Sequence, residues 1–119
     1  MLNVYLTMDT EIWWSKPDLS AIKEDYQRWF LGRSNKGEFG VPHQIKVLDN
    51  YGLKGVYFIE PLCALAAGQA LVDDMVAIVQ GAGHDVQLHL HSEWLALDAC
   101  THTDLQGINL ENCEHIRCF

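Results

Sequence analysis

The sequence has few basic residues and no cluster of them. Eight Lys and Arg residues stand against 16 Asp and Glu residues, which gives a formal net charge of -8 at pH 7. Proteins that bind nucleic acids rely on clustered cations that displace counterions from phosphates. We therefore expect no nucleic-acid partner, and for the same reason no anionic membrane surface.

Long apolar runs are also missing. A membrane-spanning helix needs about 20 consecutive apolar residues, and no stretch of the sequence approaches that length. The first residues, 1–11, include polar side chains and lack the basic start and long apolar segment of an export signal. These features predict a cytoplasmic protein with no membrane partner, in which the four cysteines are reduced thiols.

The length of the chain limits its architecture. With 119 residues, of which 49% are hydrophobic and 20% are charged, the chain has the composition of one globular domain. Closed (β/α) barrels typically contain about 250 residues. A complete barrel is therefore excluded.

Strand-like and helix-like segments alternate along residues 1–95. Strands are predicted at 2–8, 55–61 and 85–91, and helices at 18–30, 42–52 and 70–80, with a polar loop at 34–40. This alternation is typical of an α/β fold with parallel strands. A sheet of only three strands would expose its edges and an apolar face, so we also expect self-association or a missing partner segment.

Residues 96–119 form a tail with no periodic pattern. The tail contains Cys100, Cys113 and Cys118 together with two histidines, but their spacings match none of the usual structural zinc patterns. We therefore interpret these cysteines as separate thiols and leave the structure of the tail undefined.

Two pairs of chemically active residues end two of the predicted strands. Asp9 and Glu11 follow the first strand, and His89 and His91 end the third. Residues two apart in a strand point to the same face, and the carboxyl ends of parallel strands share one edge of a sheet. Two histidines and a carboxylate suit a divalent metal, with zinc as the first choice and cobalt or iron as alternatives. The competing interpretation is that the histidines are hydrogen-bonded core residues and the carboxylates only open a loop.

Such a metal would be catalytic because it lowers the pKa of a bound water molecule from 15.7 towards about 7. A spare carboxylate could then act as the general base. Two further residues are candidates for substrate binding. Glu60 ends the second strand at the same edge, although an exposed loop acid fits equally well. Trp94 follows the histidine pair and, like Trp13 and Trp14, could stack on a sugar ring, with burial in the core as the alternative.

Segments 6–11, 55–60 and 83–94 together resemble the opening of the polysaccharide deacetylase family, carbohydrate esterase family four. The resemblance runs from the start of the chain to about Trp94. It implies an incomplete, distorted (β/α) barrel. It also implies a metal-dependent hydrolase that removes acetyl groups from N- or O-acetylated sugars, so the implied partner is an acetylated carbohydrate.

The resemblance also implies roles for the first pair. In the family motif Thr-Phe-Asp-Asp, the first Asp is the general base and the second binds the metal. Asp9 matches the first of these residues, whereas the second falls on Thr10. Glu11 is then the replacement metal ligand, as Asp-x-Glu variants of the family suggest.

In the second family motif, His-x-x-x-His, the first His matches His89 and the second falls on Glu93. His91 is therefore the expected replacement ligand. The family's later motifs, including the His that serves as general acid, have no counterpart after Trp94. The chain thus resembles only the amino-terminal part of the family, which leaves two alternatives to an active enzyme: a catalytically silent metal- or carbohydrate-binding module, or a non-functional fragment.

Overall fold

A three-stranded parallel sheet organises the fold. The computed structural model describes residues 2–13 and 21–95, so the predicted tail 96–119 and Trp14 lie outside the described residues. The strands are β1 (Leu6–Thr10), β4 (Gly55–Ile59) and β5 (Asp85–Leu88), in the order β1-β4-β5. The predicted α/β fold with parallel strands is therefore confirmed. Within the described residues the sheet does not close into a barrel.

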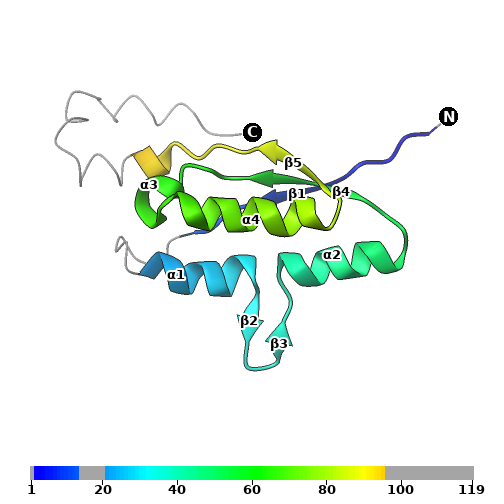
Figure 1. The fold of residues 1–119 in the computed structure, drawn as a ribbon, viewed down its shortest axis with the longest axis horizontal. Helices are drawn as coiled ribbons and strands as arrows, with labels where there is room; N and C mark the ends of the chain where they lie inside the picture. The colour runs from blue at the N-terminus through cyan, green and yellow to red at the C-terminus, as the bar shows by residue number, and fades with distance from the viewer. Residues whose placement is uncertain (1, 14–20, 96–119) are drawn as a thin grey trace.

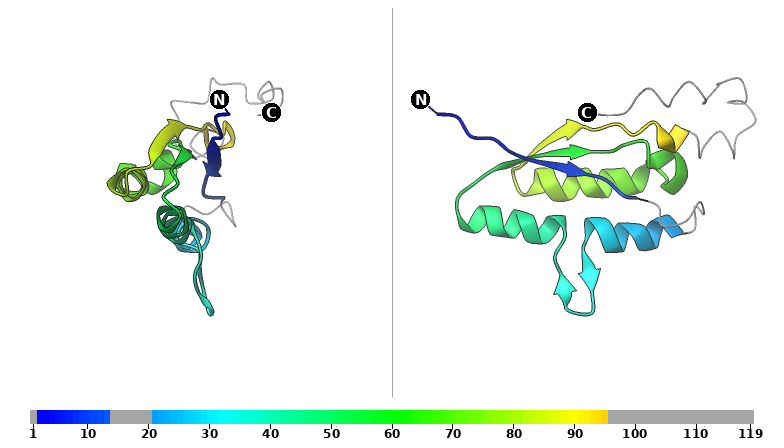
Figure 2. Two further views of the ribbon diagram at one scale, coloured as in Figure 1. Left: turned by 90° about the vertical axis from the view of Figure 1, so that its right-hand side faces the viewer. Right: turned by 180° about the vertical axis from the view of Figure 1, so that it is seen from behind.

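Helices connect the strands and lie along one side of the sheet (Figures 1 and 2). They are α1 (Ile22–Asp25), the π-helix η2 (Tyr26–Phe30), α2 (Val41–Asn50), α3 (Ala64–Ala67) and α4 (Gln69–Gly81). The predicted helix 42–52 corresponds to α2. The predicted helix 70–80 corresponds to α4, which follows a break at Gly68, where φ is 88°. No helix in the described part of the chain is long and apolar enough to cross a membrane.

The register of the sheet determines which side chains enter the core. Met8, Tyr57 and Val86 lie in one row across the three strands, and all three pack in or against the core under the helices. Because the side chains of a strand alternate between its two faces, the following row points away from the helices. That row contains Asp9, Phe58 and Gln87.

The first strand begins later and ends later than the predicted range 2–8. Leu6 pairs with Gly55, the first residue of β4, so the residues before Leu6 have no strand beside them. Val4 and Tyr5 are accordingly 75% and 76% exposed. Their β-branched and aromatic character favours a strand locally, but without a pairing partner the backbone gains no ladder hydrogen bonds. The shift brings the end of the strand to Thr10, directly before Glu11.

Other segments also differ from the prediction, including the second strand, which ends at Ile59 instead of residue 61. The region predicted as a loop contains a small hairpin of β2 (Arg33–Ser34) and β3 (Gly37–Glu38), which extends away from the helices (Figure 1). The described part of the predicted helix 18–30 changes from α1 to the wider η2, in which the Leu31 N–H reaches back to the Tyr26 carbonyl. The third strand ends at Leu88 instead of residue 91.

Candidate metal centre

The carboxyl ends of the three strands bring the candidate residues together. Glu11 follows β1, Glu60 follows β4, and His89 and His91 follow β5. The pairing of the strands continues one step past their ends, because the Glu60 N–H donates to the Thr10 carbonyl and the His89 N–H donates to the Ile59 carbonyl. The side chains after the strands are therefore held in a fixed register.

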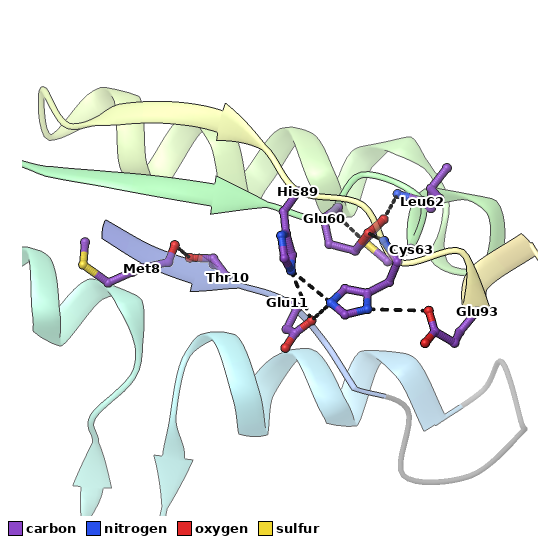
Figure 3. Close-up of polar contacts among 9 residues, drawn as sticks. Met8, Thr10, Glu11, Glu60, Leu62, Cys63, His89 and Glu93 are labelled. Carbon is purple, nitrogen blue, oxygen red and sulfur yellow. Dashed lines mark hydrogen bonds and ion pairs between the residues drawn. The ribbon is translucent and has the colours of Figure 1, made fainter. Parts of the chain in front are cut away.

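Burial on either side of Glu11 explains the direction of its side chain. Thr10 and Ile12 are 5% and 1% exposed and point into the core. The alternation of the strand thus turns Glu11 away from the core, as it also turns Asp9. In Figure 3 the Glu11 carboxylate lies below His89, and the two side chains approach each other from the ends of the two outer strands, β1 and β5.

Three donor atoms meet at this edge: Glu11 Oε2, His89 Nε2 and His91 Nε2. Together they form a group in which one ligand atom from each residue lies within 4.8 Å of the others. His89 Nε2 is 2.9 Å from His91 Nε2 and 3.7 Å from Glu11 Oε2, and His91 Nε2 is also in contact with Glu11 Oε2. The predicted convergence of these three residues is therefore confirmed.

The donor set fits a divalent metal. Tetrahedral coordination with bonds of about 2.0 Å separates neighbouring ligand atoms by about 3.3 Å. The N–N distance of 2.9 Å and the N–O distance of 3.7 Å lie on either side of this value, and His91 Nε2 and Glu11 Oε2 lie closer together than either pair. Glu11 Oε2 is shielded from solvent and accepts no hydrogen bond within the described residues. A buried carboxylate oxygen beside two imidazole nitrogens is an arrangement that a cation would stabilise.

A second carboxylate contacts the far side of one imidazole. Glu93 Oε2 lies 3.5 Å from His91 Nδ1 (Figure 3). A carboxylate at this position favours the proton on Nδ1, which leaves the lone pair of Nε2 for a metal. In the resemblance to the deacetylase family, Glu93 stands only as a departure from the second motif. Its spacing of two residues from His91 was the signal that could have identified this contact.

Glu60 is held inside the protein. Its exposed fraction is 0%, its Oε1 accepts the Leu62 N–H at 2.5 Å, and its Oε2 accepts the His91 N–H at 3.0 Å. Burial raises the pKa of the Glu60 carboxyl, and the two backbone donors act against this increase. Glu60 was predicted to bind substrate, but both its oxygens are occupied by backbone amides. Its contact with the backbone of His91 was missed, because the two residues are 31 positions apart.

The remaining predicted residues lie outside this donor group. Asp9 is exposed, pairs with Phe58 in the sheet and does not belong to the group of three metal-ligating side chains. Trp94 is 1% exposed and belongs to the hydrophobic core, so its ring faces are covered by protein in this structure. Trp13 is 43% exposed, and its ring lies 5.4 Å from the ring of His91.

Comparisons with known proteins add no further information about this site. No family model matches the chain, and neither the curated proteins nor the solved structures contain a significant match. The resemblance to polysaccharide deacetylases therefore stays a prediction, and only the metal site is argued from the geometry of its residues.

Proposed function

We propose that this chain is a metal-dependent hydrolase that removes acetyl groups from N- or O-acetylated sugars. One observation supports a metal-dependent activity: Glu11, His89 and His91 bring a carboxylate oxygen and two imidazole nitrogens together at the carboxyl edge of a parallel sheet. The acetylated-sugar substrate is what the resemblance of segments 6–11, 55–60 and 83–94 implies. The carboxyl edge is where catalytic groups gather in α/β folds. We further propose that the three strands correspond to the opening portion of an incomplete (β/α) barrel.

Glu11, His89 and His91 would hold the ion, with zinc as the first choice and cobalt or iron as alternatives. When bound, such an ion supplies an activated water molecule and polarises the acetyl carbonyl. The Glu93 carboxylate beside Nδ1 of His91 would favour the proton on that nitrogen and leave Nε2 free for the ion. Asp9 is the proposed general base, since it lies on β1 two residues before Glu11, points to the same side and is open to solvent.

Metal analysis tests the binding half of the proposal. Protein purified without added metal, then loaded with one equivalent of zinc and desalted, should retain about one ion per chain. His89→Ala and His91→Ala should each lose it. His43→Ala is the matched control, because His43 is exposed on α2 and contacts only the Phe39 ring among the described ring contacts. Unchanged zinc content in both site variants would overturn the metal site.

Acetate release tests the catalytic half. The zinc-loaded protein should release acetate from an acetylated chito-oligosaccharide, and Asp9→Ala should reduce the rate by at least about 100-fold, which is the usual contribution of a general base. Asp73→Ala serves as the control, because Asp73 is an exposed carboxylate on α4.

A second function is favoured by the position of Asp9 outside the donor group. A metal- or carbohydrate-binding module without hydrolytic activity would use the same three ligands and need no base. Protein that binds zinc normally but releases no acetate would support this alternative and contradict the hydrolase.

A further inference from the structure

Glu60 combines complete burial with two hydrogen bonds from different segments of the chain. A carboxylate at 0% exposure is costly unless donors compensate for the water that it has lost. Here the Leu62 N–H donates to one oxygen and the His91 N–H donates to the other, at 2.5 Å and 3.0 Å (Figure 3). The side chain thus joins the turn after β4 to the segment after β5.

The contact with His91 falls where the backbone pairing of the sheet stops. The His89 N–H donates to the Ile59 carbonyl at 3.0 Å. In a parallel ladder the next N–H directed at the same neighbouring strand belongs to the residue two positions further on, which is His91. The Glu60 carboxylate accepts that N–H in place of a backbone carbonyl. Both histidines are therefore tied to β4, His89 through the backbone and His91 through a side chain.

We propose that Glu60 is a positioning residue that holds the backbone of His91 so that its imidazole meets Glu11 and His89. The inference rests on the proposed metal site, but the role differs from the substrate contact predicted for Glu60. Because Glu60 reaches the His91 N–H and not its ring, it acts on the ligand through the orientation of the main chain. Glu93 acts on the ring itself.

The chemistry of the contact requires two acceptors. A carboxylate accepts both backbone N–H groups, whereas the amide of Gln has one acceptor oxygen and must turn its NH₂ group toward the other N–H. Glu60→Ala removes both acceptors. The two variants should therefore form a graded series in which Gln retains part of the function that Ala loses.

Zinc affinity, measured by competition with a chelating dye, is the main readout. Glu60→Ala should bind zinc about 10- to 100-fold more weakly than the wild type, the range typical of residues that orient metal ligands, and Glu60→Gln should lie between the two. The visible absorption of the cobalt-loaded protein should change in the same order, because it reports the ligand geometry. Val79→Ala is the control: Val79 is fully buried on α4, so its truncation lowers stability while the ligands remain aligned.

The amide signals of the metal-free protein give a second, independent readout. In a ¹⁵N-labelled sample, the His91 N–H should be protected from exchange in the wild type and lose that protection in Glu60→Ala. A wild type that binds no zinc would contradict the proposed function, and the amide signals alone would then decide the role of Glu60. If Glu60→Ala does not fold, the same comparison is made with Glu60→Gln. Zinc affinity and His91 protection equal to those of the wild type in the folded variant would overturn the proposal.

Discussion

Tyr26, Tyr51 and Tyr57 place a phenolic hydroxyl in three different environments. Replacing each of them with Phe removes that hydroxyl and keeps the ring. Tyr57 is 0% exposed, and its hydroxyl oxygen is shielded from solvent without a hydrogen-bond partner in the described part of the protein. Its ring packs edge-on against the ring of His84, with a centroid distance of 5.6 Å. A buried hydroxyl without a partner keeps a desolvation cost of about 1–3 kcal/mol. The Tyr57→Phe substitution removes this cost and preserves the ring.

We expect Tyr57→Phe to stabilise the protein by about 1 kcal/mol, the lower end of that range, because the missing oxygen leaves a small void. For a domain of this size, a change of 1 kcal/mol corresponds to an increase in Tm of about 4 °C. This sign is unusual, since most substitutions of fully buried residues destabilise a protein.

The other two tyrosines are matched controls with different expected signs. Tyr26 is 7% exposed, and its hydroxyl donates to a carboxylate oxygen of Asp74. Tyr26→Phe should therefore destabilise the protein by about 1 kcal/mol. Tyr51 is 76% exposed, so Tyr51→Phe should change the free energy of unfolding by less than about 0.5 kcal/mol.

The pH dependence of stability supplies a second test of the Tyr57 environment. Burial raises the pKa of Tyr57, and the negative charge of Asp49 raises it further. The folded protein thus keeps the phenolic proton at a pH at which the unfolded chain has lost it, so this group lowers stability as the pH rises above about 10. Tyr57→Phe lacks that loss. The difference in the free energy of unfolding between Tyr57→Phe and the wild type should therefore widen above pH 10. Tyr26 is present in both proteins, so its contribution cancels from this difference.

Urea unfolding followed by circular dichroism, at pH 7 and at pH 10.5, measures all three variants. The decisive result is the sign for Tyr57→Phe relative to Tyr26→Phe. A loss of 1 kcal/mol or more for Tyr57→Phe at pH 7 would refute the reasoning, because it would show that the hydroxyl is hydrogen-bonded in solution, for example to a buried water molecule.

Two further predictions concern the structure around the strands. His84 is 4% exposed and its Nδ1 accepts the Gly55 N–H at 3.0 Å, so His84→Ala should cost about 2–3 kcal/mol in urea unfolding, whereas His84→Asn, which keeps an acceptor near that position, should cost less. A similar cost for both variants would contradict the role of the hydrogen bond. Gly40→Ala should destabilise the protein by about 2 kcal/mol or more, because a Cβ at this position would lie 2.1 Å from the Phe30 carbonyl oxygen. Gly81→Ala on α4 meets no atom within 4 Å and should be neutral or stabilising in the same assay, and equal effects of the two would contradict the steric argument.

The ligands of the candidate site could be predicted from the sequence because their geometry is local. His89 and His91 are two positions apart after an extended strand, so the period of the strand places both imidazoles on one side. Glu11 follows another strand, and the alternation of strands and helices implied that the strand ends share one edge. The structure confirms that the three side chains meet. These inferences need only the strand period and the parallel topology.

The residues that support those ligands depend on contacts between distant parts of the chain. The start of β1 at Leu6 is determined by where β4 begins, and local propensity alone placed the strand four residues too early. The burial of Trp94 depends on the helices that pack around it. Periodicity describes one segment at a time, so it could not distinguish a core tryptophan from one that stacks on a sugar.

The difference between Glu11 and Glu60 shows why residue type at a strand end does not by itself identify a ligand. Both glutamates directly follow a strand, and both lie at the same edge of the sheet. β4 is the central strand, with neighbours on both sides, so Glu60 is enclosed and its oxygens accept backbone N–H groups. β1 is at the edge of the described sheet, and one oxygen of Glu11 faces two imidazoles and accepts no hydrogen bond from the part of the chain that the structure describes. The order of the strands thus explains why the central carboxylate accepts main-chain N–H groups while the outer one faces the two imidazoles.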